Sequence, residues 1–323
     1  MKKYRNLYII VPILVLTLLI IVAILLIINN QHDHVLKPSN SSHTHISQNT
    51  QQTPNSNSSI LAYVYVIVEE NKPYNSIVNN AQAPYINSLI MNYALATNYS
   101  AVSHPSLPNY LALTSGSTDG INTDCNPPSA GCEVNVANIA DEIEASGRSW
   151  KEYAESMSSN CNAYNSGEYV TKHNPFVYYS DIINNPARCN NHVVPFINLA
   201  SDLSNINTTP NYAFITPNLC DDMHDCSIAT GDTWLAKYVP LILQSRAFTT
   251  QPSLLAIVWD EGNSSNNQVA AILAGSAVKN GYQSGVSFSH YSLLHTIEDA
   301  WGLKPLTNND SQAPLMTNFF KTF

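Results

Sequence analysis

Four short apolar runs, three of which end in polar side chains, constrain most strongly how this 323-residue chain can fold. The first run, residues 61–70, shows no polar alternation and ends in two acids, as expected of a central strand covered on both faces. Similar runs occupy residues 211–218, 254–262 and 269–275. Helical patterns lie between them, so we predict an α/β domain with a mostly parallel central sheet and helices on both faces.

Polar clusters stand where these predicted strands end. In parallel sheets, ligands bind beyond the carboxyl ends of the strands. Several acids brought together there would repel one another unless a cation lay between them, so we predict one or two divalent metal ions. The candidate donors are Glu70, Asp222, Asp260, Glu261, His224 and His290. This mixture of oxygen and nitrogen suits zinc, manganese or iron, and calcium if oxygen dominates.

Each of these residues also has a purely structural interpretation. Glu70 and Asn71 could cap the following helix. Asp222 and His224 could hold a loop closed by a disulfide, and His290 could begin a surface helix. It is the joint arrival of these residues at strand ends that favours a functional site.

The stretch SHPSLPNYLALTSG, residues 103–116, places Ser106 where a loop with two prolines gives way to an apolar helix. This position suits a nucleophile, because the start of a helix stabilises negative charge. It is also an ordinary position for a helix N-cap. The residues alone leave both interpretations open.

The N-terminal part predicts a membrane anchor. Residues 7–28 carry no charge and are long enough to cross a hydrocarbon core of roughly 30 Å, although a buried core helix is the alternative. Residues 1–6 hold three basic side chains, which by the positive-inside rule lie in the cytoplasm. No signal-peptide cleavage site is evident, so we expect an uncleaved signal anchor. Residues 29–59 read as a flexible polar stalk and residues 60–323 as an extracytoplasmic domain.

The cysteines and the glycosylation triplets agree with a location outside the membrane. All six cysteines lie beyond residue 28, and an even number outside a membrane favours disulfides over a zinc site. Proximity along the chain favours the pairs Cys125–Cys132, Cys161–Cys189 and Cys220–Cys226. Glycosylation triplets begin at Asn98, Asn207, Asn263 and Asn309.

From residue 60 onward, the chain has 22 acidic side chains and 10 basic ones. This excess of negative charge argues against nucleic-acid binding.

Six ordered motifs resemble those of the phosphoesterase family, which contains acid phosphatases and type C phospholipases and belongs to the alkaline-phosphatase-like superfamily. The motifs are VEENKPYNSI, HPSLPNYLALTSGSTDGI, KHNPFVYY, FITPNLCDDMHD, VWDEG and HYSLLHTIEDAWGL. The resemblance extends over most of the predicted extracytoplasmic domain. It implies an alkaline-phosphatase-like α/β/α sandwich and a metal-dependent phosphoric ester hydrolase.

The resemblance also implies roles for individual residues. The second motif is similar to a stretch of nucleotide pyrophosphatases whose threonine is the nucleophile, and by that match Ser106 attacks phosphorus. Asn109 would point its amide at the phosphoryl oxygens, His173 would face the phosphate, and Lys72 would bind the substrate. His104 would either protonate the leaving group or merely pack beside it.

The metal ligands implied by the resemblance are Glu70, Asn71, Asp222, His224, Asp260, Glu261 and His290. The acidic pair Asp260–Glu261 supplies oxygen where the wider superfamily has histidine, which leaves the number and identity of the metal ions open. We therefore expect a membrane-anchored, outward-facing acid phosphatase that hydrolyses small phosphomonoesters through a phosphoseryl intermediate. The alternatives are a phospholipase C-like phosphodiesterase and a cell-surface protein that retains the fold without the reaction. The oligomeric state stays open.

Overall fold

The computed structural model describes residues 60–129, 131–263 and 266–323. The predicted cytoplasmic segment, membrane anchor and stalk, residues 1–59, lie outside the described residues. Among the helices that are described, none combines the length and apolarity needed to cross a bilayer.

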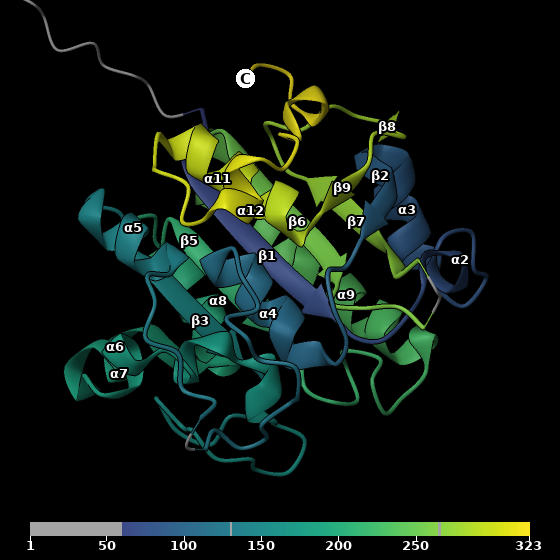
Figure 1. The fold of residues 1–323 in the computed structure, drawn as a ribbon. Coiled ribbons are helices and arrows are strands. Elements are labelled where there is room, and N and C mark those ends of the chain that lie inside the picture. Colours follow the sequence, from purple (N-terminus) through teal and green to yellow (C-terminus); the bar gives the residue numbers. More distant parts are fainter. Residues whose placement is uncertain (1–59, 130, 264–265) are drawn as a thin grey trace, which may run out of the picture. The chain divides into compact units, whose positions relative to one another are not determined.

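Nine strands form one sheet within the described residues (Figure 1). Its strand order is β4-β3-β5-β1-β6-β7-β2-β8, and β9 pairs with β2. The strands are β1 (Tyr63–Glu69), β2 (Ala94–Ser100), β3 (Trp150–Ala154), β4 (Val193–Pro195), β5 (Tyr212–Thr216), β6 (Ser253–Trp259), β7 (Gln268–Ala274), β8 (Tyr282–Ser284) and β9 (Phe288–Ser289). The four predicted runs correspond to β1, β5, β6 and β7.

The sheet is mostly parallel, as predicted. β1 lies between β5 and β6 and pairs in parallel with both, and all residues of these three strands are buried. Among the described strands, only β7 runs antiparallel, to β6 and β2. Residues 260–267, which join β6 to β7, are too few for the crossover of a dozen or more residues that a parallel partner needs, so β7 returns beside β6.

Helices cover both faces of the sheet, as predicted (Figure 1). Figure 1 shows α4 (Ser106–Ser115) and α11 (His290–Trp301), which contact each other, in front of the sheet. It shows α9 (Ile228–Leu243), which packs against α3 (Pro84–Asn92), behind it. The remaining helices are α2 (Tyr74–Ile77), α5 (Ile139–Ala145), α6 (Ser180–Ile183), α7 (Pro186–His192), α8 (Leu199–Leu203), α10 (Arg246–Thr250) and α12 (Asn308–Ser311), with 3₁₀ turns η1 (Thr171–His173), η2 (Pro175–Val177), η3 (Phe196–Asn198) and η4 (Thr317–Phe319).

The three disulfides are confirmed. The pairs are Cys125–Cys132, Cys161–Cys189 and Cys220–Cys226. All three lie in the segment between α4 and α9. Covalent links there limit the freedom of the unfolded chain and so favour the folded state.

A buried acid in α11 makes the stability of the fold depend on pH. Glu298 is fully buried, its Oε1 accepts the backbone N–H of Leu306 at 3.2 Å, and Asp310 lies beside it. Burial, followed by repulsion from Asp310, raises the pKa of Glu298 to about 9. Because this folded-state pKa exceeds that of the unfolded chain, the stability that the protonated acid contributes is complete at acidic pH and is lost as pH rises through about 9.

Glu298→Gln is therefore expected to stabilise the protein in mildly alkaline solution. The glutamine cannot ionise, so we expect the melting temperature at about pH 8 to rise by roughly 3 °C or more, with little change at about pH 5. Thermal unfolding at both pH values measures this, with the exposed Glu168→Gln as the matched control. A melting temperature at pH 8 that falls below that of the unchanged chain would contradict the assignment.

Candidate active site

The carboxyl ends of β1, β5 and β6 bring distant acids together. Glu69 pairs with Trp259 across β1 and β6, so Glu70 and Asp260 leave neighbouring strands side by side. The Asp260 N–H donates to the Glu69 carbonyl at 2.9 Å, and the Glu70 N–H donates to the Asp222 carbonyl at 2.8 Å. Backbone hydrogen bonds thus hold three of the predicted acids at one edge of the sheet.

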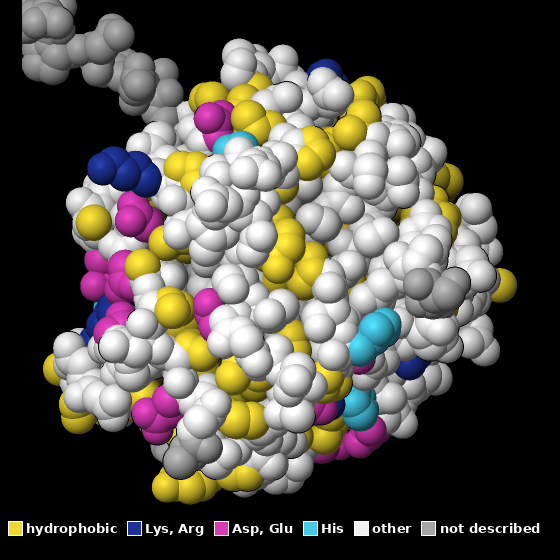
Figure 2. Space-filling model, in the orientation of Figure 1, with side chains coloured by type: hydrophobic (Ala, Val, Ile, Leu, Met, Phe, Trp, Pro, Cys, Tyr) yellow, Lys and Arg dark blue, Asp and Glu magenta, His cyan; other side chains and the backbone are white. Residues whose placement is uncertain are grey.

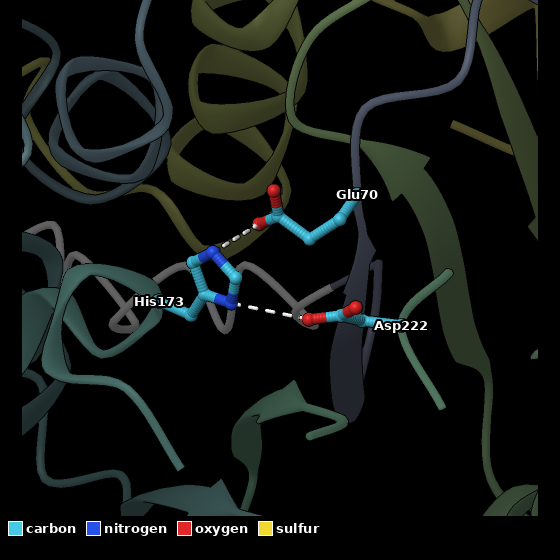
Figure 3. A group of neighbouring side chains, drawn as sticks. All are labelled: Glu70, His173 and Asp222. Carbon is cyan, nitrogen blue, oxygen red and sulfur yellow. Dashed lines mark ion pairs between the residues drawn. The ribbon is translucent and has the colours of Figure 1, made fainter. Parts of the chain in front are cut away.

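Glu70, His173 and Asp222 form a compact group of ligand atoms that lie within 4.8 Å of one another (Figure 3). His173, at the end of η1, points between the two acids. Its Nε2 lies 3.2 Å from Glu70 Oε1 and its Nδ1 lies 3.1 Å from Asp222 Oδ2. All three side chains are buried. The histidine predicted to face the phosphate is therefore placed among the candidate metal ligands.

Ser106 faces this group. Its hydroxyl donates to Glu70 Oε2 at 3.3 Å, and the residue is 1 % exposed. The N-cap of α4 is Pro105, and Ser106 is the first residue inside the helix. The alternative in which Ser106 serves as an ordinary N-cap is therefore wrong. Its oxygen lies at the positive end of the helix dipole, where an alkoxide is stabilised.

Tyr110 fixes the orientation of Glu70. Its hydroxyl donates a short hydrogen bond to Glu70 Oε1, which leaves Oε2 turned toward Ser106. Its ring stacks on His173 with centroids 5.4 Å apart. Tyr110 is not among the predicted site residues, although its position four residues after Ser106 places both on one face of a helix.

His104 and Glu261 form an ion pair at the open rim of the site. His104 Nδ1 contacts Glu261 Oε2, and the histidine side chain is 54 % exposed. Burial, followed by repulsion from Asp124, raises the pKa of Glu261 to about 7. Glu261, which the sequence predicted to be a metal ligand, is thus the partner of His104 in the structure.

Two predicted substrate-binding residues make other contacts. The Asn109 amide is buried and makes four hydrogen bonds of 3.0–3.2 Å to the backbone of residues 102–105. It therefore shapes the loop before Ser106 and does not point at phosphoryl oxygens. Lys72 donates to the Met223 carbonyl at 2.7 Å and so ties the loop after β1 to the loop after β5.

Asn71 and His290 support Asp260. The Asn71 backbone N–H donates to Asp260 Oδ1 at 2.9 Å, from a residue with φ 51°. His290 is fully buried, with Nε2 2.7 Å from the Asp260 carbonyl oxygen and Nδ1 3.0 Å from the Tyr99 hydroxyl. Because both ring nitrogens already have hydrogen-bond partners, the predicted ligand role of His290 does not fit this structure.

His224 contacts a lysine at the edge of the site, and the structure does not place it in the ligand group. Its Nδ1 lies 2.7 Å from Asp225 Oδ1 and its Nε2 lies 3.3 Å from Lys172 Nζ. An ammonium only donates, so Nε2 is the acceptor and Nδ1 carries the proton. Figure 2 shows histidine side chains at the surface near the carboxyl end of β1. Lys172 is not among the predicted site residues.

Comparison with known proteins identifies the family. The sequence model of the phosphoesterase family matches residues 29–304, more than four fifths of the chain. The chain belongs to the phosphoesterase family. Family membership makes it a phosphoric ester hydrolase, as its motifs predicted.

The phosphoesterase has named relatives. It is 36 % identical over 264 residues to the phosphatidylinositol-3-phosphatase of Mycobacterium tuberculosis, a match that covers 80 % of this chain and 83 % of that protein. It is 32 % identical over 235 residues to the acid phosphatase of Aspergillus fumigatus, a match that covers 69 % of this chain and 51 % of that protein. The chain thus spans about half the length of that fungal relative.

Solved structures confirm the fold of the phosphoesterase. A protein in the alkaline phosphatase superfamily from Vibrio parahaemolyticus has a TM-score of 0.56 at 11 % identity and covers 79 % of this chain and 70 % of that one. Murine ectonucleotide pyrophosphatase/phosphodiesterase 5 has a TM-score of 0.51 at 11 % identity, and the match covers 78 % of this chain and 100 % of that one. The domain therefore has the alkaline-phosphatase-like fold that the motifs implied.

The donor atoms of this phosphoesterase fit a divalent cation. His173 Nε2, Asp222 Oδ2 and Asp260 Oδ2 are buried and make no hydrogen bond to the described residues. The two contacts of His173 lie within ion-pair distance, but hydrogen-bond geometry leaves its Nε2 and the Asp222 oxygen unsatisfied. Unsatisfied buried polar atoms are costly, and a cation bound within the group of Glu70, His173 and Asp222 would satisfy the atoms of His173 and Asp222.

The charges of Glu70, Asp260 and His173 also favour a bound cation. Burial, followed by repulsion from Asp260 and Asp222, raises the pKa of Glu70 well above its ordinary value. Burial, followed by repulsion from Glu261, raises the pKa of Asp260 to about 7. Burial also lowers the pKa of His173, which keeps the ring neutral and able to bind a metal. A cation would replace this repulsion with attraction. Its identity stays open.

Proposed function

We propose that this phosphoesterase is an acid phosphatase that hydrolyses phosphomonoesters through a phosphoseryl intermediate. The observation that carries the proposal is the hydrogen bond from Ser106 to Glu70, a member of the group with His173 and Asp222. The acid phosphatase and phosphatidylinositol-3-phosphatase names of its relatives support a monoester substrate.

In the proposed reaction Ser106 Oγ attacks phosphorus and its proton passes to Glu70 Oε2. The bond from phosphorus to the ester oxygen breaks, and His104, paired with Glu261, gives a proton to the departing alkoxide. Water then attacks phosphorus and gives a proton to His104, the bond from phosphorus to Ser106 Oγ breaks, and Glu70 returns its proton to the serine oxygen, which releases inorganic phosphate. A cation bound by Glu70, His173, Asp222 and Asp260 would supply charge neutralisation and lower the pKa of an adjacent hydroxyl.

Groups of the chain itself are available for the phosphoryl oxygens. Lys172 directly precedes His173 of the ligand group. Burial lowers the pKa of Lys172, but the charges of Glu70 and Asp124 raise it more, so the side chain is an ammonium. The N–H groups in the first turn of α4 are a second set of donors. These take the role that the sequence analysis assigned to Asn109 and Lys72.

Hydrolysis of two p-nitrophenyl esters by the purified full chain tests the proposal. We expect kcat/KM for the monoester to exceed that for the bis(p-nitrophenyl) diester by roughly 100-fold or more, and both activities to disappear on chelation. Preference for the diester would favour the phospholipase C-like alternative. No turnover of either ester by folded, metal-loaded protein would favour a non-catalytic surface protein.

We also propose that residues 7–28 anchor the enzyme in the cell membrane, with residues 1–6 cytoplasmic and residues 60–323 outside. The uncharged apolar run, the basic residues before it and the disulfides of the folded domain support this arrangement. Protease added to intact cells should remove the domain and leave an N-terminal tag protected. Digestion of the tag alone would contradict the orientation. Glycosylation of the triplets that begin at Asn98, Asn207, Asn263 and Asn309 stays a prediction.

A further inference from the structure

An acidic side chain of the chain itself already lies at the start of α4. The first N–H groups of a helix have no partners inside the helix and commonly bind anions such as phosphate. Here Asp124 Oδ1 accepts the N–H of Leu107, the residue after Ser106, at 3.3 Å. A carboxylate therefore uses a donor that directly adjoins the predicted nucleophile.

The second oxygen of the Asp124 carboxylate contacts a cationic side chain. Asp124 Oδ2 lies 3.2 Å from Lys172 Nζ. The Lys172 side chain is only 11 % exposed and is held on its other side by His224 Nε2 at 3.3 Å. Because the lysine is mostly shielded from solvent, this pair is stronger than an ordinary surface ion pair.

The Asp124 side chain can rotate away from the Leu107 N–H and the Lys172 ammonium and return to them. Its side chain is 31 % exposed, and it precedes Cys125, whose disulfide to Cys132 closes a short loop. The backbone beside it is held, because Tyr178 donates to the carbonyls of Asp124 and Cys125 at 3.4 and 2.9 Å. Rotation of the side chain alone would release both donors while the loop stayed in place.

An anion that bridges a helix N–H and an ammonium beside Ser106 makes the contacts that a phosphoryl group would make there. We propose that Asp124 is an internal competitor that occupies the phosphoryl-oxygen site and thereby sets the affinity of the enzyme for phosphorylated ligands. The inference rests on the proposed function and adds a determinant of its substrate affinity. A phosphomonoester must displace the carboxylate before its oxygens reach Leu107 and Lys172. The rival role for Asp124 is to hold Lys172 in position, and it predicts the opposite result.

Binding of inorganic phosphate to Asp124→Asn separates the two roles. We expect calorimetric titration of the metal-loaded full chain to show Kd lowered by roughly fivefold to tenfold, because the neutral amide competes less for both donors. KM for p-nitrophenyl phosphate should fall with it. An unchanged or higher Kd would overturn the inference, because a carboxylate that merely positions Lys172 would weaken binding when lost.

Three further variants control the experiment. Glu133→Gln removes an exposed charge close to Asp124 in sequence, and should leave Kd unchanged. Lys172→Met should raise Kd by roughly tenfold or more. Asp124→Ser repeats the test if the asparagine variant does not fold. Absence of phosphate binding and of monoester hydrolysis in the unchanged chain would refute the proposed function itself, whereas normal binding without an effect at position 124 would refute this inference alone.

Discussion

Replacing Ser106 with alanine is expected to reduce kcat/KM for a phosphomonoester by at least about 10³-fold, because no other hydroxyl contacts Glu70 Oε2 among the described residues. The fold should persist, since the hydroxyl is a small buried group whose removal leaves α4 intact. Steady-state hydrolysis of p-nitrophenyl phosphate measures the loss. Mass spectrometry of acid-quenched enzyme should detect phosphate on the peptide that holds Ser106, and none in the variant.

Ser103→Ala is the matched control for this experiment. Its hydroxyl lies three residues earlier and donates to the His104 carbonyl at 3.2 Å, so activity should change by no more than about twofold. If Ser106→Ala retained a tenth or more of the activity, the phosphoseryl mechanism would be wrong. If the two variants lost activity equally, the effect would belong to the loop and not to a nucleophile.

Neutralising Asp260 is expected to raise the stability of the metal-free protein and to abolish the activity of the metal-loaded enzyme. Burial, followed by repulsion from Glu261, raises the folded-state pKa of Asp260 to about 7, above that of the unfolded chain. Stability contributed by its protonated form is therefore complete at acidic pH and lost as pH rises through about 7. Asp260→Asn cannot ionise, so in chelator at about pH 8 its melting temperature should exceed that of the unchanged chain by roughly 3 °C or more.

Added Zn²⁺ or Mn²⁺ should reverse the order of the two proteins. The unchanged chain should gain stability from a cation that binds only its folded state, and Asp260→Asn should gain much less because a buried ligand oxygen is lost. Thermal unfolding with chelator and with each metal measures both effects. Asp299→Asn, an exposed acid of α11, is the control and should respond like the unchanged chain. A full metal-induced gain in Asp260→Asn would remove that residue from the site.

The residues that the sequence located correctly are those whose placement depends on strand order. Buried apolar runs predicted β1, β5, β6 and β7, and the rule that parallel strands end together predicted that Glu70, Asp222 and Asp260 would gather. β2 and β3 escaped notice because polar side chains interrupt their short runs. The antiparallel direction of β7 follows from the short connection between β6 and β7, which the prediction of a mostly parallel sheet did not take into account.

The residues whose contacts differ from those expected are ones whose role depends on the direction of one polar atom. His290 has the residue type of a ligand, but Tyr99, far away in sequence, and the Asp260 carbonyl contact its two nitrogens. Asn109 makes contacts with the loop before its own helix, which no spacing rule distinguishes from contacts with a ligand. Lys172 and Asp124 were missed because two segments far apart in sequence bring them together beside α4 only in the folded chain.

Anomalous diffraction from crystals soaked in Mn²⁺ would test the central claim most directly. The claim is that folding places a cation among Glu70, His173, Asp222 and Asp260 next to the hydroxyl of Ser106. We predict an anomalous peak about 2.0–2.6 Å from oxygens of Glu70 and Asp260, with Ser106 Oγ as its neighbour. A peak elsewhere, or one with the serine oxygen more than about 5 Å away, would contradict the account.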